Sequence, residues 1–144
     1  PDNLFVASFI GSPQMNFIPC TAEEKEGNVY LSFPGHTIRM NDAKAKILKD
    51  GGYIGRKVML GIRPEDLYDP SYSLKDFHES ITSKITVREM VGAEIFLYFD
   101  LNGAAMTARV DPKCSYRVND EAKLLIDTDK IHLFDPETEK KIAD

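Results

Sequence analysis

Apolar and polar residues alternate with a period of two over most of this chain, a pattern that predicts β-strands. The clearest case is residues 94–101, where every second residue from Ile95 to Leu101 is apolar. Asn102-Gly103 and a second alternating stretch, 104–110, follow directly, so the sequence predicts a hairpin with a type I′ turn. The same pattern, with turn residues between the stretches, predicts further strands at 15–22, 28–33, 36–40, 57–62, 81–89, 123–126 and 131–134, the last two as a pair.

Helical periodicity is confined to two short segments. Asp42 can cap a helix that continues through Leu48 and ends at Gly51-Gly52. A second helix is expected before Gly11-Ser12-Pro13, where Asp2 or Asn3 can cap it. The apolar residues of this helix indicate that it packs on this domain or on another one. They include Phe5, Phe9 and Ile10.

The number and spacing of these strands indicate the fold class. About eight short strands with a turn about every ten residues are typical of a small β-barrel or sandwich. We therefore expect a mainly all-β domain over 14–144, with residues 1–13 as an apolar appendage. Residues 68–80 are polar and are expected to form a long loop, and the tail from Asp135 is charged.

The predicted strand 81–89 and the hairpin after it present two different faces. We expect Ile81, Ile85 and Val87 to point inward. Phe96 and Tyr98 fall on the face opposite the apolar residues of their strand. Three interpretations remain open for this aromatic pair: stacking on nucleobases, contact with a protein, or cover by the domain's own loops or N-terminal helix.

Composition narrows the function classes. The 144 residues carry a net charge of −5 and have an estimated pI of 5.2, which argues against a nucleic-acid binder because such proteins normally present a basic face. The chain contains no run of 18 apolar residues, so no membrane span is predicted. Cys20 and Cys114 have no CxxC spacing and are expected to be reduced structural thiols of a cytosolic protein.

Motifs that would indicate an enzyme are absent from the sequence. There is no GxxxxGK[ST] loop, no GxSxG elbow and no HExxH pair, and the three histidines do not form a metal pattern. Arg63, Glu65 and Asp66 are close in sequence, but adjacent carboxylates diverge, and we interpret this segment as a turn that begins at Pro64. We expect no catalysis, no metal and no cofactor in this chain alone.

Four segments in chain order resemble one protein family. The chain is similar to the ATP-binding subunits of ABC transporters that import sugars, the maltose and multiple-sugar type. One departure is Ser8, which stands where the family usually has Gly. The four matching segments are Phe5–Pro13 with Met15-Asn16-Phe17, Val58–Leu67, Val87–Glu94 and Lys130–Asp135.

This resemblance implies a fold and a role. It implies a C-terminal regulatory domain built of OB-like (TOBE) β-barrel units, with residues 1–13 as the end of an ATPase domain that lies upstream. ATP and Mg²⁺ would bind in that upstream domain. The implied partners are a second ATPase subunit in a homodimer, the permease subunits through the ATPase domain, and a regulatory protein, with no nucleic acid. The implied location is the cytoplasm, peripheral on the inner face of the cell membrane.

The resemblance also implies functional positions. Gly55, Gly61, Ser83 and Glu89 correspond to family positions in a surface tied to regulation, although the maltose type has Gly where Ser83 stands. Phe5, Phe9 and Ile10 would be interdomain packing residues. With Gly92 and the aromatic pair added, the candidate regulator or dimer surface is Gly55, Gly61, Ser83, Glu89, Gly92, Phe96 and Tyr98.

Two other functions remain as alternatives. The first is a small-ligand sensor for an oxyanion or a sugar, with backbone amides near Gly92-Ala93 and hydroxyls of the strand 82–86 as the place to look. The second is an oligonucleotide-binding domain that uses Phe96 and Tyr98.

Overall fold

The computed structural model describes residues 14–75 and 77–144, and these form two compact units. Unit 1 combines the described residues up to Ile62 with Thr128–Asp144, and unit 2 is Arg63–Asp127. The described chain consists mostly of β-strands, as expected. The expected N-terminal helix, with Phe5, Phe9 and Ile10, lies outside the described residues, and the proposed domain boundary at residue 14 stays a prediction.

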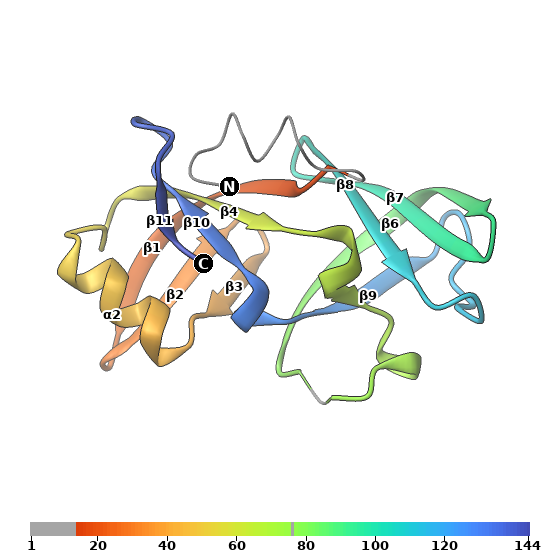
Figure 1. Ribbon diagram of the computed structural model, residues 1–144, viewed down its shortest axis with the longest axis horizontal. Coiled ribbons are helices and arrows are strands. Elements are labelled where there is room, and N and C mark those ends of the chain that lie inside the picture. The colour runs from red at the N-terminus through yellow and green to blue at the C-terminus, as the bar shows by residue number, and fades with distance from the viewer. Residues whose placement is uncertain (1–13, 76) are drawn as a thin grey trace. The chain divides into compact units, whose positions relative to one another are not determined.

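Unit 1 contains a six-stranded antiparallel sheet with the strand order β11-β10-β4-β1-β2-β3 (Figure 1). Every second residue of β2 is buried, which is the alternation that the sequence predicts. The tail from Asp135 contains a short strand, β11, that the sequence analysis missed. The strands are β1 (Asn16–Lys25), β2 (Asn28–Phe33), β3 (His36–Arg39), β4 (Lys57–Ile62), β10 (His132–Phe134) and β11 (Lys141–Ala143).

One α-helix, α2 (Asp42–Asp50), accompanies this sheet and packs on β2 and β11. Leu48 is fully buried on its inner side. The expected cap was Asp42, but the N-cap is Asn41, whose side-chain oxygen accepts a hydrogen bond of 2.8 Å from the backbone N–H of Lys44. Either residue type can cap a helix, and the extended backbone at Asn41 decides between them.

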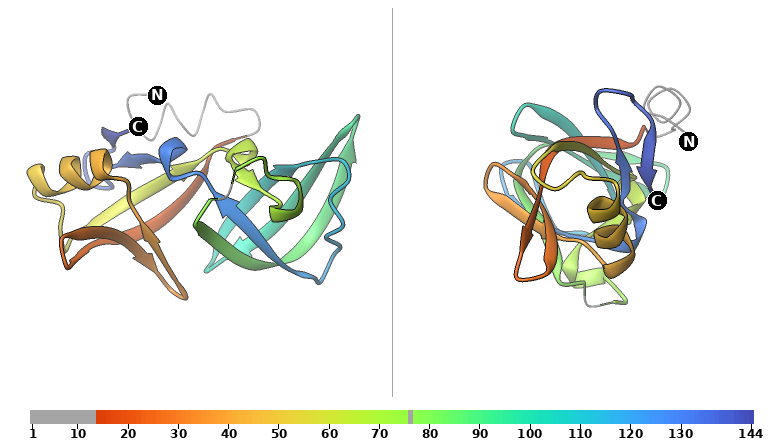
Figure 2. Two further views of the ribbon diagram at one scale, coloured as in Figure 1. Left: turned by 90° about the horizontal axis from the view of Figure 1, so that it is seen from below. Right: turned by 90° about the vertical axis from the view of Figure 1, so that its left-hand side faces the viewer.

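Unit 2 contains a five-stranded antiparallel sheet with the order β5-β9-β6-β7-β8, whose strands are strongly curved (Figure 2). The long strand β6 pairs with β9 along its first half and with β7 along its second half. The strands are β5 (Leu67–Tyr68), β6 (Glu79–Val91), β7 (Glu94–Leu101), β8 (Ala104–Val110) and β9 (Glu121–Ile126). Three 3-10 helices complete the described elements of the chain: η1 (Pro64–Asp66), η2 (Pro70–Tyr72) and η3 (Thr128–Lys130).

The hairpin between β7 and β8 is confirmed. Asn102 and Gly103 have φ values of 55° and 88°, as a type I′ turn requires. Glu26 and Gly27, between β1 and β2, have the similar values 52° and 83°. The second turn was not singled out because Glu rarely adopts a positive φ.

Two expectations about strand geometry were wrong. Residues 123–126 and 131–134 do not pair, because β9 joins β5 and β6 in unit 2 whereas β10 joins β4 and β11 in unit 1. Val87 does not point inward and is 48% exposed. The register shifts between Ile85 and Val87, where β6 advances two residues while β7 advances one. The extra residue is a β-bulge, which moves all later residues of β6 to the opposite face.

Candidate functional site

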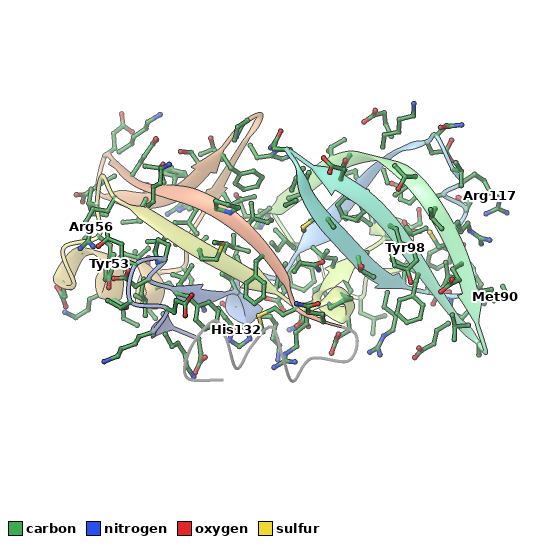
Figure 3. The ribbon with its side chains drawn as sticks, turned by 90° about the horizontal axis from the view of Figure 1, so that it is seen from above. Tyr53, Arg56, Met90, Tyr98, Arg117 and His132 are labelled. Carbon is green, nitrogen blue, oxygen red and sulfur yellow. The ribbon has the colours of Figure 1, made fainter. Side chains whose placement is uncertain are left out.

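The structure brings three of the predicted site residues together on one face of β6 and β7. Glu89 lies opposite Phe96, and Val87 lies opposite Tyr98, so all four side chains share a face. The hydroxyl of Tyr98 donates a hydrogen bond of 3.2 Å to Oε1 of Glu89. We call Val87, Glu89, Val91, Phe96 and Tyr98 the β6–β7 face, and Figure 3 shows Tyr98 on it.

The β6–β7 face is partly apolar and partly exposed. Val87 and Val91 are 48% and 50% exposed, and the two aromatic rings are half-buried. Partial burial and the neighbouring Glu89 carboxylate raise the pKa of Tyr98 above its ordinary value of 10. The three interpretations of the aromatic pair all stay predictions, because half-buried rings are compatible with each of them.

Two further predicted site residues, Ser83 and Gly92, lie outside the β6–β7 face. Ser83 precedes the bulge and shares the side of β6 with the buried residues Ile81 and Ile85. Its hydroxyl donates to the backbone oxygen of Asp100 at 2.8 Å, so Ser83 is not part of the β6–β7 face. Gly92 is exposed in the turn between β6 and β7, where its φ of 62° favours glycine.

Gly55 and Gly61 both lie in unit 1, but one is exposed and the other is buried. Gly55 is exposed in the loop before β4, has a φ of 85°, and donates its N–H to the oxygen of Ala22 at 2.7 Å. Gly61 is buried in β4, so the expectation that it lies on a surface is wrong. A methyl group there would approach Sδ of Met15 to 2.6 Å, which shows that Gly61 leaves room for core side chains.

A polar cluster that the sequence analysis missed holds the Gly55 loop. Tyr53 donates its hydroxyl to Oδ2 of Asp135 at 2.8 Å, and the Arg56 guanidinium lies 4.8 Å from the centre of the Tyr53 ring (Figure 3). Asp135 also accepts from the backbone N–H groups of Glu137 and Thr138. These bonds, led by the one from Tyr53, lower the pKa of Asp135. The contact joins residues 82 positions apart, so no local motif could reveal it.

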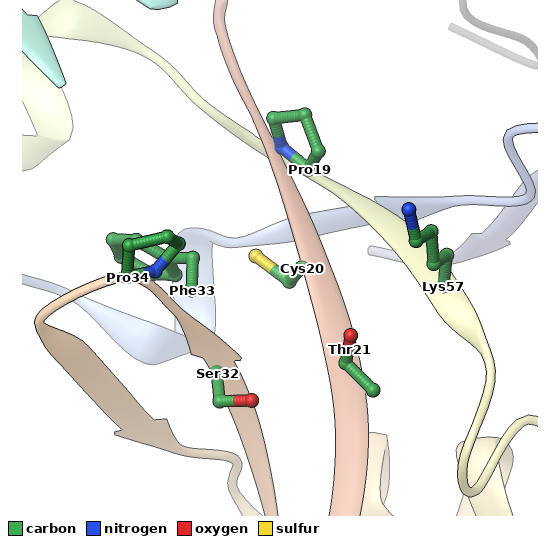
Figure 4. Close-up of a pocket in the computed structure, with 7 residues that line it drawn as sticks. All are labelled: Pro19, Cys20, Thr21, Ser32, Phe33, Pro34 and Lys57. Carbon is green, nitrogen blue, oxygen red and sulfur yellow. The ribbon is translucent and has the colours of Figure 1, made fainter. Parts of the chain in front are cut away.

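A shallow pocket of about 440 Å³ lies on β1 and β2 and includes Cys20, Phe33, Pro34 and Lys57 (Figure 4). Cys20 is 3% exposed, and burial raises the pKa of its thiol to about 12. A thiol of this kind is protonated at neutral pH and is a poor nucleophile. The described residues also contain no group of three or more side chains that could hold a metal ion.

Comparison with known proteins agrees with this fold. Residues 11–67 match the family model of the MalK OB fold domain. This stretch of the chain is similar to a MalK-type OB-fold domain. That match includes Gly55 and Gly61, whereas the β6–β7 face lies beyond it.

The curated proteins to which the chain is similar include ATP-binding subunits of transporters. Over 99% of its length the chain is 38% identical to the oligosaccharides import ATP-binding protein MsmX of Bacillus subtilis. It is 34% identical, again over 99% of its length, to the multiple sugar-binding transport ATP-binding protein MsmK of Streptococcus mutans and to the sulfoquinovosyl glycerol transport ATP-binding protein SmoE of Agrobacterium fabrum. The chain spans 38% of MsmX and 37% of each of the other two.

One solved structure shares the fold of this chain at low sequence identity. It is the cytoplasmic molybdate-binding protein ModG with molybdate bound, with a TM-score of 0.56 at 12% identity. The match covers 82% of this chain and 94% of ModG. Among the described residues, no helix has the length and apolar character that crossing a membrane requires.

Proposed function

We propose that this chain is the regulatory and dimerising region of the ATP-binding subunit of an ABC transporter that imports sugars. The observation that carries the proposal is similarity over 99% of the chain to subunits named for oligosaccharide and multiple-sugar transport. In this proposal ATP and Mg²⁺ bind in a part of the subunit outside these residues, because the chain lacks a phosphate-binding GxxxxGK[ST] loop. The chain itself performs no catalysis.

The β6–β7 face is the proposed contact surface. It presents the exposed apolar side chains of Val87 and Val91 beside Phe96 and Tyr98, and aromatic residues are enriched in protein interfaces. The partners we propose are a second copy of the subunit and a regulatory protein. The permease subunits would bind the ATPase part, and the assembly would lie on the cytoplasmic face of the membrane.

Two alternatives have weaker support. The fold shared with ModG favours an oxyanion sensor, but the Thr86 hydroxyl already donates to the backbone oxygen of Tyr98, and the net charge of −5 opposes anion binding. An oligonucleotide would meet the Glu89 carboxylate next to Tyr98, and like charges repel its phosphates. The oxyanion sensor and the oligonucleotide-binding domain therefore rank below transport regulation.

Sedimentation velocity and calorimetry on the purified chain test the proposal. We expect concentration-dependent self-association, no heat of ATP binding, and weaker association in the Phe96→Ala/Val87→Ser double variant. The matched control is Lys84→Ala/Thr82→Ser, which changes exposed residues of the half of β6 before the bulge. ATP binding with micromolar affinity, or equal association of both double variants, would contradict the proposal.

A further inference from the structure

Unit 2 contains a pocket that the proposed function does not use. It has a volume of about 350 Å³, which lies within the range of small-molecule sites. Its wall combines η1, β5 and η2 with the start of β7 and the end of β8. We call it the β5–β8 pocket, and its polar and aromatic lining residues are Glu65, Tyr68, Asp69, Tyr72, Glu94, Arg109 and Asp111.

The pocket offers hydrogen-bond acceptors and a donor in one place. Arg109 approaches Glu94 with 3.7 Å between Nη1 and Oε1, and its guanidinium carries five N–H donors. Asp111 accepts the backbone N–H of Lys113 with Oδ1 at 2.8 Å, which holds this carboxylate in place. Glu65 adds a further half-buried carboxylate.

Two tyrosines add aromatic surface to the same pocket. The ring of Tyr68 stacks on Phe77 with centroids 5.2 Å apart and an interplanar angle of 18°, which fixes its orientation. Burial is the main cause of a raised pKa of Tyr68, and the nearby carboxylates of Asp66, Asp127 and Glu65 add to it. Like any tyrosine at neutral pH, Tyr68 carries a hydroxyl that can donate a hydrogen bond. Tyr72 on η2 is 41% exposed and accessible to a ligand.

We propose that the β5–β8 pocket binds a mono- or disaccharide, so that the regulatory region senses the imported sugar; this rests on the proposed function. A saccharide has many hydroxyls that donate to carboxylates and accept from a guanidinium, and it has C–H faces that pack on aromatic rings. The pocket supplies both kinds of partner within a volume that suits one or two sugar rings. A sugar bound there would contact β7 and β8 and so couple to the sheet that carries the β6–β7 face.

The charge of the β5–β8 pocket favours a neutral saccharide over an oxyanion or a polyamine. Four carboxylates line it, from Glu65, Asp69, Glu94 and Asp111, against the one guanidinium of Arg109. This excess of negative charge repels an oxyanion. A polyamine would match the carboxylates but would leave the Arg109 donors and the tyrosine rings with poorer partners, so the neutral saccharide fits the whole set better.

A titration followed by ¹H–¹⁵N NMR on the 144-residue chain tests the proposal. The probes are maltose and glucose, with spermidine as the cation and molybdate as the oxyanion. We expect saturable shifts with maltose or glucose at the amides of 65–72, 93–94 and 109–111. No saturable shift with either sugar up to high millimolar concentration, or shifts there with spermidine or molybdate alone, would overturn the proposal.

Two matched pairs of variants locate the site. Glu65→Gln should weaken saccharide binding about tenfold, as the loss of a hydrogen bond to a charged group does, while Glu121→Gln on the exposed side of β9 leaves it unchanged. Tyr72→Ala should weaken binding, while Leu74→Ala, a fully exposed residue after η2, should not. Equal affinities within each pair would refute the location. Because sugar binding is read on the single chain, a chain that self-associates yet binds no sugar would refute this inference alone.

Discussion

The α-carbon of Gly61 and the side chain of Met15 share a space in unit 1 that has no room for a further methyl group. A Cβ atom at Gly61 would lie 2.6 Å from Sδ of Met15 and 3.2 Å from Cε2 of Phe134. Met15 and Phe134 are 3% and 0% exposed, and Phe17 packs on them from the neighbouring strand. Gly61 is therefore a packing position of the core.

We expect Gly61→Ala to destabilise the chain by about 1–3 kcal/mol, the usual cost of overpacking a core. Urea denaturation followed by circular dichroism measures the change. Shortening Met15 to Ala in the same chain should remove part of the clash, so the double variant should be less destabilised than the sum of the single changes. Simple additivity of the two changes would refute the contact as the cause.

The Tyr53–Asp135 hydrogen bond should make stability depend on pH in the acid range. The pKa of Asp135 is lowered in the folded chain from its ordinary value of 3.8, so the stabilisation is fully present above that value and is lost as the pH falls through the lowered pKa. The stability difference between the unmodified chain and Asp135→Asn should therefore be largest near neutral pH and should shrink below pH 3.8. Urea titrations at several pH values measure it, and a difference that grows on acidification would contradict the assignment.

A second variant isolates the hydroxyl in the same cluster. Tyr53→Phe should lower the melting temperature because it removes the bond to Asp135 and keeps the ring beneath Arg56. Tyr30→Phe, on a half-buried tyrosine of β2 in the same unit, is the matched control. Equal melting temperatures for the two variants would show that the hydroxyl contributes nothing.

The hydrogen bond between Tyr98 and Glu89 should affect the pKa of the Tyr98 hydroxyl. Because partial burial and the Glu89 carboxylate raise the pKa of Tyr98, Glu89→Gln should lower it toward its ordinary value of 10. NMR of ¹³C-labelled tyrosine resolves the six tyrosines individually. Glu121→Gln should leave the Tyr98 pKa unchanged, and an equal shift in both variants would mean that the carboxylate does not act locally.

Both cysteines should resist alkylation in the folded chain. Burial raises the pKa of the Cys20 thiol to about 12 and that of Cys114 to about 11, where the carboxylate of Asp69 adds to the effect. At pH 8 we expect slow reaction of both thiols with iodoacetamide, followed by mass spectrometry, and fast reaction after unfolding in urea. Rapid labelling of either thiol in the native chain would contradict a structural role.

The site shows where sequence reasoning stops. The alternation in 94–101 placed Phe96 and Tyr98 together, and the structure places the candidate residue Glu89 opposite Phe96. The hydrophobic pattern could not place Ser83, because the bulge after Ile85 separates this residue from the β6–β7 face. A bulge leaves little trace in such a pattern. The family resemblance implied a surface position for Gly61, but its burial depends on Met15 and Phe134, which are distant in the chain.

The sequence by itself determined the strands and the Asn102-Gly103 turn, because these depend on residue alternation and on backbone conformations that few residues adopt. It also carried the family resemblance that the comparisons bear out. Only the tertiary structure decided that β9 and β10 lie in different sheets, that Tyr53 bonds Asp135, and that η1, β5, η2 and β8 enclose a pocket. These features join segments that are far apart along the chain, and the pairing of distant segments depends on the packing of the whole fold rather than on any local pattern of residues.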